Sequence, residues 1–253
     1  MSKRIAISNQ KGGVGKTTTA VNLASALTVY KKRVLLADMD AQGNACSGLG
    51  LSVSEDQPSM YNVLLMDTPV RETIIETAIK GLDLIPVNGH LSGAPIELAD
   101  AEEREFRLYH ALEEIKHDYD YIIIDCPPAL DLLTLNGLTA ADSVLIPIQC
   151  EYYALEGMTK LMKTIRLVQE SLNPDPAIEG ILLTMYDSRT NLSNQVVEEV
   201  TSYFKEKVFQ TIIPRSVRIS EAPSHGVPID QYDPTGAGTK GYIKLAEELI
   251  NHG

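Results

Sequence analysis

The sequence has few cysteines and no long apolar run, and each shortage excludes a class of protein. Three cysteines, Cys46, Cys126 and Cys150, occur in 253 residues, and no two of them have the C-x-x-C spacing. This odd, scattered set fits neither a disulfide framework nor a zinc knuckle, which favours a reducing cytoplasm. No apolar run approaches the roughly 20 residues of a membrane span, and the end of the chain carries no basic amphipathic helix. We therefore expect a cytoplasmic protein with no membrane contact.

Basic residues are also scarce relative to acidic ones. Lys and Arg together number 22 against 34 Asp and Glu, which gives a formal net charge of -12. Such a chain does not coat nucleic acid with its whole surface, so any contact with DNA requires a local basic patch. The five histidines are scattered, which favours surface or packing positions over metal binding. With 44% hydrophobic residues, the chain can bury one sizeable core, and we predict a single domain spanning residues 1–253.

What the chain does contain, near its start, is a glycine-rich turn between an apolar run and a helical run. The apolar residues at 5–7 predict a strand, three glycines between positions 12 and 15 break it, and helical periodicity begins at Lys16. Glycines let consecutive backbone N–H groups turn inward, and the helix aims the positive end of its dipole into the same space. The natural guest of such a loop is a polyphosphate. By this motif Lys16 reaches the β and γ phosphates, and the Thr17 hydroxyl binds Mg²⁺.

Short apolar strands and helical runs alternate along the rest of the chain. Strands are predicted at 33–38, 82–86, 119–125, 142–148, 179–185 and 211–214. Helices are predicted at 102–117, 155–172, about 193–204 and 241–251, with short peripheral helices at 51–80. The β-branched run at 119–125 suits a central strand that is buried on both faces. This alternation predicts an α/β fold with a doubly wound, mostly parallel sheet. Together with the glycine-rich loop, it is the arrangement expected of a P-loop NTPase.

The loop departs from the usual phosphate-loop pattern at its front. Gln10 stands where glycine is expected, and Lys11 adds a second lysine ahead of Lys16. The segment from Lys11 to Thr17 therefore resembles the deviant Walker A motif of the MinD/ParA family. The resemblance implies that Lys11 reaches the nucleotide bound by the partner subunit of a dimer. It also implies a set of residues around ATP, namely Lys11, Gly12, Gly13, Val14, Gly15, Lys16, Thr17 and Thr18.

Three carboxylates at predicted strand ends resemble the hydrolytic residues of that family. Asp125 ends an apolar strand, as the Walker B aspartate does, and would hold water ligands of Mg²⁺. The segment that begins at Asp38 resembles switch I, which implies that Asp40 positions the attacking water while Asp38 supports it near Lys16. The implied Mg²⁺ site is Thr17, Asp40 and Asp125, and the implied catalytic residues are Lys11, Lys16, Asp38 and Asp40. Ala41 replaces the proline usual in the family, which leaves switch I less preorganised and affects the hydrolysis rate more than nucleotide binding.

Three later segments resemble the chromosomal ParA (Soj) branch of the family rather than MinD. They lie at 147–157, 183–191 and 213–226. The resemblance implies a sandwich homodimer that forms with ATP and Mg²⁺ and binds double-stranded DNA without sequence preference. It also implies a ParB-like, centromere-binding partner that stimulates ATP hydrolysis and release from DNA. The expected location is the cytoplasm, on the nucleoid.

The same resemblance assigns residues to the base and to DNA. Pro214 and Arg215 match the adenine pocket, and Arg189 and Arg218 match arginines that contact DNA. A dimer presents each of these arginines twice, so a basic strip can form on an acidic chain. We therefore expect dimerisation to act as the switch for DNA binding.

Alternatives to this interpretation stay open. A MinD-like membrane-positioning ATPase would need a basic amphipathic C-terminal helix, and an iron–sulfur P-loop enzyme would need a cysteine pair that bridges a cluster. Relatives of the partition branch also position plasmids, chemoreceptor arrays and division sites, which a likeness of fold does not separate. A carboxylate pair or a thiol nucleophile could suggest another hydrolytic reaction, but no histidine pairs obviously with a cysteine. The phosphate loop accounts for the carboxylates without further assumptions.

Overall fold

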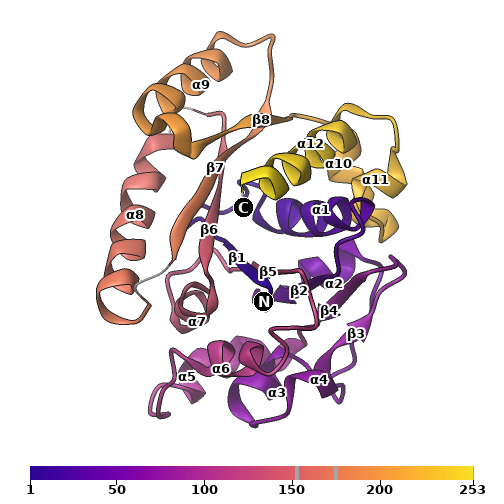
Figure 1. The fold of residues 1–253 in the computed structure, drawn as a ribbon, viewed down its shortest axis with the longest axis vertical. Helices are drawn as coiled ribbons and strands as arrows, with labels where there is room; N and C mark the ends of the chain where they lie inside the picture. Colours follow the sequence, from indigo (N-terminus) through magenta and orange to yellow (C-terminus); the bar gives the residue numbers. More distant parts are fainter. Residues whose placement is uncertain (152–153, 174–175, 253) are drawn as a thin grey trace.

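Eight strands form one sheet in the computed structural model, which describes residues 1–151, 154–173 and 176–252 (Figure 1). The strands are β1 (Lys3–Ile7), β2 (Val34–Asp38), β3 (Ile75–Glu76), β4 (Leu82–Ile85), β5 (Tyr121–Asp125), β6 (Ser143–Gln149), β7 (Ala177–Tyr186) and β8 (Val208–Pro214). Their order across the sheet is β3-β4-β2-β5-β1-β6-β7-β8. All neighbouring pairs are parallel except β3 and β4, which are antiparallel. The predicted α/β fold with a mostly parallel sheet is confirmed.

The strand β5 explains how this sheet positions a site. Every residue of β5 is buried, and the strand pairs with β2 on one side and β1 on the other. A β-branched run suits this position because a central parallel strand packs against helices on both faces. The register places Asp125 level with Asp38 on β2 and with Ile7 on β1, where the glycine-rich loop begins. The carboxyl ends of three strands thus meet at one edge, which is where ligands bind in open α/β sheets.

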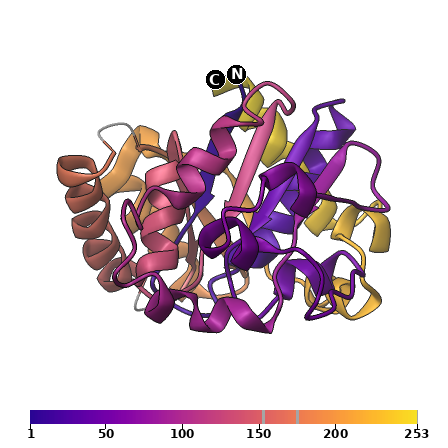
Figure 2. The ribbon, with the colours of Figure 1, turned by 90° about the horizontal axis from the view of Figure 1, so that it is seen from below.

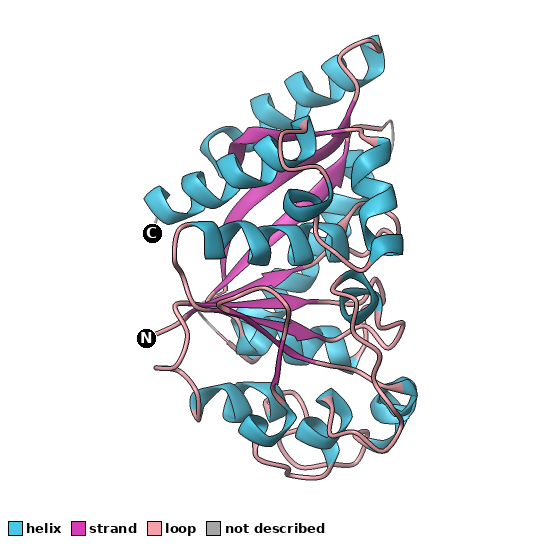
Figure 3. Ribbon diagram, turned by 90° about the vertical axis from the view of Figure 1, so that its right-hand side faces the viewer, coloured by secondary structure: helices cyan, strands magenta, loops and turns pink. Residues whose placement is uncertain are grey.

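Helices cover both faces of the sheet, as Figures 1 and 3 show. On one face α1 packs against β1, β2, β5 and α12, with α2, α10 and α11 beside them; α7, α8 and α9 lie on the other face. The helices are α1 (Lys16–Val29), α2 (Asn44–Gly48), α3 (Met60–Leu65), α4 (Val70–Thr73), α5 (Ala94–Glu97), α6 (Arg107–Glu113), α7 (Leu132–Ala140), α8 (Ala154–Ser171), α9 (Asn191–Phe204), α10 (Val217–Glu221), α11 (Ile229–Tyr232) and α12 (Ala237–His252). Three 3₁₀ turns are η1 (Gly89–Gly93), η2 (Lys205–Lys207) and η3 (Ala222–His225). Both ends of the described chain lie on the same side of the molecule, at the top of Figure 2, and Figures 1 and 3 show them separated from each other.

Two helical predictions were incomplete. The helix predicted at 102–117 is only α6, because its first residues form turns in which Glu103 has a φ of +50°. The acidic residues there have no apolar face to bury, and the burial that stabilises the helix starts at Leu108. The sequence prediction also missed α7. Nearly all residues of this helix are buried, so its sequence shows no amphipathic period. Asp131 caps the helix, because its side chain accepts hydrogen bonds from the N–H groups of Leu133 and Thr134.

The C-terminal helix has no apolar face left for a membrane. Tyr242, Leu245, Ala246 and Leu249 are buried, and α12 packs against α1 and β8. Glu248 accepts hydrogen bonds from the backbone N–H groups of Gln210 and Thr211, at 2.6 and 3.0 Å, which ties α12 to the edge strand. Within the described part of the chain, no helix combines the length and the apolar character needed to cross a bilayer.

We predict that Gly180→Ala lowers the free energy of unfolding by about 1–3 kcal/mol, because a Cβ at this position of β7 would clash with three ring carbons of Phe209. Urea denaturation of the variant and the parent measures the difference. Adding Phe209→Leu should restore part of the loss, since the smaller side chain leaves room for the methyl group. Equal stability of Gly180→Ala and parent would contradict the packing described for β7 and β8.

Candidate nucleotide site

The glycine-rich loop between β1 and α1 has the backbone shape that an anion requires. Gly13 and Gly15 adopt φ values of +75° and +88°, which side chains with a Cβ rarely tolerate. Gly15 is the N-cap of α1, and no side chain caps the first turn of that 14-residue helix. Its N-terminal N–H groups therefore remain available to a bound anion, with the positive end of the helix dipole behind them.

The two lysines of the loop occupy different environments. The side chain of Lys16 is buried, and its Nζ donates to the carbonyl oxygen of Lys11 at 3.4 Å. Burial lowers the pKa of Lys16, and the charges of Asp125 and Asp40 act in the opposite direction. The Lys11 side chain is 35% exposed, and its Nζ lies 3.7 Å from Glu151 Oε2. Lys16 thus points into the site of its own subunit, whereas Lys11 lies at the surface.

Two buried carboxylates, Asp38 and Asp125, stand at the ends of β2 and β5, and the charge of Asp125 acts on Lys16. Asp38 Oδ1 accepts the Asp40 N–H at 3.0 Å, and burial raises the pKa of Asp38 to about 7. Burial and the neighbouring Asp38 raise the pKa of Asp125 well above its usual range, an effect that the nearby Thr17 hydroxyl partly offsets. Among the described residues, neither carboxylate oxygen of Asp125 has a hydrogen-bond partner of good geometry. A buried acceptor without a donor is costly, so this position fits a hydrated cation.

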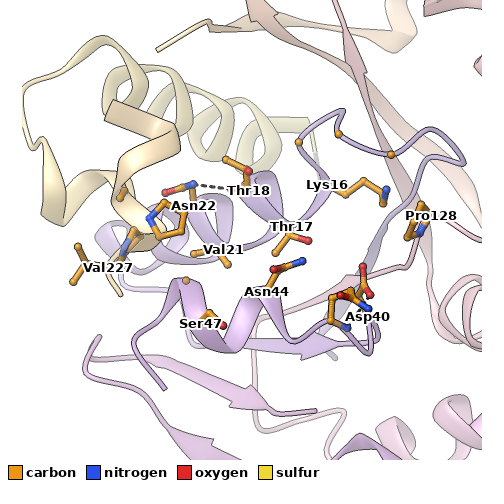
Figure 4. A pocket seen from close by; sticks show the side chains of 18 residues that line it. Lys16, Thr17, Thr18, Val21, Asn22, Asp40, Asn44, Ser47, Pro128 and Val227 are labelled. Atoms are coloured by element: carbon orange, nitrogen blue, oxygen red, sulfur yellow. Dashed lines mark hydrogen bonds between the residues drawn. The ribbon is translucent and has the colours of Figure 1, made fainter. Parts of the chain in front are cut away.

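The residues present fit Mg²⁺ rather than a metal held by protein ligands alone. Thr17 and Asp40 line the same hollow as the phosphate loop, and Figure 4 shows them around the space next to Lys16. No group of three or more His, Cys, Asp or Glu residues in the described chain is placed to hold a metal ion. Magnesium commonly takes one or two protein oxygens and completes its shell with phosphates and waters, which matches this donor set.

The turn after β2 compensates in part for the missing proline. Asp38 Oδ1 accepts the Asp40 N–H, and Asp40 Oδ1 in turn accepts the Gln42 N–H at 3.1 Å. These two side-chain hydrogen bonds hold the backbone where Ala41 stands in place of proline. Asp40 is only half-buried and faces the hollow.

Residues that the sequence did not single out hold the loop in place. Thr184 on β7 donates its hydroxyl to the Val14 carbonyl oxygen at 2.9 Å, with both residues buried. Asn9 accepts the Lys11 N–H at 3.0 Å and donates to the Pro147 carbonyl oxygen at 2.7 Å. No signal in a single sequence marks these contacts, because Thr184 lies far along the chain from Val14, and Asn9 lies far from Pro147.

Gln10, where the usual phosphate-loop pattern has glycine, lies beside α8 on the other face of the sheet. Its Nε2 donates to the Thr164 hydroxyl at 3.0 Å. The side chain is half-buried and does not line the hollow. A glutamine at this position therefore leaves the space for phosphate open.

The hollow beside the loop has a volume of about 490 Å³. Its walls include Gly12, Gly13, Gly15, Lys16, Thr17 and Thr18 at one end, and Ser47, Val227 and Pro228 at the other. Val14 is buried and is not part of this lining, and its carbonyl oxygen accepts the hydrogen bond from Thr184. Pro128, three residues after the strand end at Asp125, also lines the hollow.

The structure does not bring the two residues predicted for adenine into this hollow. Pro214 ends β8 and lines a separate depression beside α12, and the Arg215 N–H donates to the Tyr186 carbonyl oxygen at 2.8 Å. Met185 lies next to the loop, because its methyl carbon is 4.0 Å from the position of a Cβ on Gly15. Met185 has a φ of +52°, an uncommon conformation at the end of a strand.

The two arginines predicted for DNA lie outside the phosphate-loop hollow. The Arg189 side chain, in the turn after β7, is 86% exposed and pairs with Asp187 at 2.7 Å. The Arg218 side chain, on α10, is 61% exposed, and its Nη1 lies 3.3 Å from Glu221 Oε2. Tyr152 and Tyr153, within the family-like segment at 147–157, lie outside the described residues.

The cysteines do not support the alternatives based on thiol chemistry. All three are free and buried. Burial raises the pKa of Cys46 and of Cys150 to about 12, and that of Cys126 also rises because the thiol is buried next to Asp125. Such thiols carry almost no thiolate at neutral pH and make poor nucleophiles.

Comparison with known proteins places this site in a family. A family model described as an AAA domain matches residues 2–178. The chain is 57% identical over 253 residues, the full length of both chains, to the sporulation initiation inhibitor protein Soj of Bacillus subtilis. It is 56% identical over 246 residues, 97% of this chain and 87% of the relative, to the chromosome partitioning protein ParA of Myxococcus xanthus.

A solved structure adds a bound nucleotide to the comparison. The cobyrinic acid a,c-diamide synthase from Mycobacterium smegmatis, with bound ADP and magnesium, has a TM-score of 0.87 and 38% identity to this chain. The match covers 100% of this chain and 95% of that one. The full-length identity to Soj and ParA shows that the chain belongs to the ParA/Soj family of chromosome-partitioning ATPases.

Proposed function

We propose that residues 1–253 form one ATPase domain that works as an ATP-dependent dimeric switch for chromosome or plasmid segregation. The dimer binds double-stranded DNA without sequence preference, hydrolyses ATP slowly and is released by a ParB-like partner that stimulates hydrolysis. The observation that carries this proposal is the buried Lys16 whose charge acts on the buried carboxylate of Asp125, at the mouth of a glycine loop. The proposed location is the cytoplasm, on the nucleoid.

Each residue of the site has a proposed task that its position supports. The N–H groups of the loop and Lys16 bind the phosphates, and burial keeps the Lys16 ammonium close to them instead of in water. Thr17 and Asp125, with Asp40, would hold Mg²⁺, which when bound supplies positive charge to the phosphate oxygens. Asp40 orients the attacking water, and Asp38 fixes the Asp40 backbone through its 3.0 Å hydrogen bond.

Lys11 is the proposed link to the second subunit. Its ion pair with Glu151 is long, at 3.7 Å, and both side chains are partly exposed, so the interaction costs little to break. The lysine is therefore able to leave Glu151 and reach the nucleotide bound by a partner subunit. Nucleotide binding would in this way favour the dimer.

DNA binding by an acidic chain requires the dimer in this proposal. If Arg189 and Arg218 from each subunit neutralise roughly four phosphates, the slope of log affinity against log salt is about -3.6. Affinity for DNA then falls on the order of a hundredfold between about 50 and 200 mM salt. Partition of a different cargo would use the same switch with another partner. A ParB-like gene beside this one would favour DNA segregation.

The proposed function predicts that DNA affinity depends on the nucleotide. Binding to a labelled duplex of random sequence should be strong with ATP and Mg²⁺ and at least tenfold weaker with ADP or with no nucleotide, because only the dimer carries both sets of arginines. Gel shift or fluorescence anisotropy at fixed salt makes the comparison. Equal affinity in the three states would reject the switch.

The two lysines should separate nucleotide binding from dimerisation. We expect Lys16→Ala to abolish ATP binding in calorimetry, since it removes the buried phosphate ligand. Lys11→Ala, the matched variant, should keep ATP binding within about threefold and lose the ATP-dependent dimer in light scattering, because an exposed charge contributes little within its own subunit. Normal ATP binding by Lys16→Ala would refute the assignment of the loop, and a normal dimer of Lys11→Ala would remove that residue from the interface.

Asp40→Ala should bind ATP and stay dimeric while turnover falls by about a hundredfold or more, as expected when a residue that positions the attacking water is lost. A phosphate-release assay measures turnover, and the dimer fraction is followed in the same sample. Asp83→Asn on β4, which also removes one carboxylate charge but lies in a separate depression away from the hollow, is the control. Unchanged turnover of Asp40→Ala would exclude Asp40 from the reaction.

A further inference from the structure

Arg189 is held by a carboxylate in the manner in which an arginine holds a phosphate. Its Nε donates to Asp187 Oδ1 at 2.8 Å, and its Nη2 donates to Asp187 Oδ2 at 2.7 Å. Two parallel hydrogen bonds from one edge of the guanidinium are the geometry by which arginine also binds phosphate groups. The edge best suited to a DNA phosphate is thus already occupied within the same chain.

The turn after β7 fixes Asp187 in this position. Asp187 Oδ1 also accepts the backbone N–H of Arg189 at 3.1 Å, and the Asp187 carbonyl oxygen accepts from the Thr190 N–H at 3.1 Å and from its hydroxyl at 3.0 Å. These bonds make an Asx turn at the start of α9. The hydrogen bonds from the Arg189 side chain lower the pKa of Asp187 to about 2, so this carboxylate is ionised throughout the neutral range.

A second arginine adds to the positive field around this carboxylate. The charge of Arg215 also lowers the pKa of Asp187, and the Arg215 backbone donates to Tyr186, the residue before Asp187. Arg215 is exposed at the end of β8. Asp187 therefore neutralises part of the charge that the turn after β7 and the end of β8 would otherwise present to an anion.

We infer that the Asp187 carboxylate competes with a DNA phosphate for the side chain of Arg189, and that this competition lowers the affinity of the DNA-binding face. The inference rests on the proposed function, because it concerns the same face. On binding, Arg189 exchanges the two carboxylate oxygens of Asp187 for two phosphate oxygens, and Asp187 is left next to a second negative charge. A single subunit gains little from this exchange, so DNA binding depends on the several exchanges that a dimer makes at once.

Arg218 shows a looser version of the same arrangement. Its Nη1 lies 3.3 Å from Glu221 Oε2 and 3.4 Å from the Tyr232 hydroxyl, and its guanidinium carbon is 5.8 Å from the centre of the Tyr232 ring. Glu221 shares its oxygen with the Tyr232 hydroxyl at 3.1 Å. Glu221 offers one long contact where Asp187 offers two short ones, so it competes less strongly with phosphate.

The opposite function for Asp187 would be to aim Arg189 at DNA. A carboxylate that only positions the arginine helps binding, so its loss weakens affinity. A competitor opposes binding, so its loss strengthens affinity. The sign of the change therefore separates the two functions.

The test is Asp187→Asn in the full chain, with anisotropy of a fluorescein-labelled duplex of random sequence in ATP and Mg²⁺ at about 100 mM salt. Asparagine keeps the oxygen that accepts the Arg189 N–H, so the turn should remain. We expect DNA affinity to rise about five- to twentyfold, the factor expected when two exposed ion pairs in a dimer no longer oppose binding. The dependence on ATP should weaken, while ATP turnover without DNA should be unchanged.

Three comparisons make the result specific. Asp67→Asn removes the same charge from a distant ion pair with Arg107, at a position whose φ of +48° suits asparagine, and should leave DNA affinity unchanged. In an Arg189→Ala background, Asp187→Asn should give no gain, since the effect acts through Arg189. Asp187→Ser, which can also keep a side-chain hydrogen bond in the turn, should reproduce the gain if asparagine disturbs folding.

The outcomes distinguish this inference from the function on which it rests. If Asp187→Asn binds DNA as tightly as the parent or more weakly, Asp187 does not compete with the phosphate. The same conclusion follows if Asp67→Asn gives an equal gain in affinity, or if the gain persists in the Arg189→Ala background. Failure of the parent chain to bind DNA with ATP would instead overturn the proposed function.

Discussion

The site depends on two carboxylates that parallel pairing forces into one buried corner. The register of β2, β5 and β1 places Asp38 and Asp125 next to each other, since each ends its strand at the same level of the sheet. Burial raises the pKa of each, and the charge of Lys16 lowers that of Asp125. Like charges so close in a low dielectric are unfavourable unless a cation offsets them. This buried corner therefore suits a bound cation.

Backbone conformation and hydrogen bonds from neighbouring strands hold the phosphate loop next to this corner. The loop takes its shape from glycines at positive φ, while Thr184 and Asn9 attach it to strands on the far side of β1. Thr184 is followed at once by Met185, and three residues after Thr184 comes Asp187, which holds Arg189. One short stretch of chain thus connects the phosphate loop to the proposed DNA face. In the proposed function, coupling between nucleotide and DNA would run through this stretch, and a change at either end would bias the other if the stretch had two arrangements.

Much of the fold and of the nucleotide site could be predicted from the sequence, because the residues that determine them lie close together along the chain. A strand, a glycine turn and a helix follow one another within residues 3–29, and the apolar run before Asp125 fixes its place in the sheet. The prediction was weaker where burial replaces periodicity, as in α7, or where charged residues extend a helical pattern past the point at which burial begins, as before α6. The sequence did not predict the roles of Thr184 and Asp187, because these roles depend on a contact across the sheet and on hydrogen bonds within a turn. The prediction of Pro214 and Arg215 for adenine remains a prediction, and Met185 lies next to the loop.

We propose that a nucleotide bound at this buried charged corner makes the chain dimerise. The most direct test is the molar mass of the purified chain by light scattering, across a titration of ATP with Mg²⁺ and again with the metal chelated. The account predicts a dimer that appears only when ATP and Mg²⁺ are both present and that saturates together with nucleotide binding. A chain that remains monomeric at saturating Mg²⁺-ATP, or that is equally dimeric without nucleotide, would contradict it.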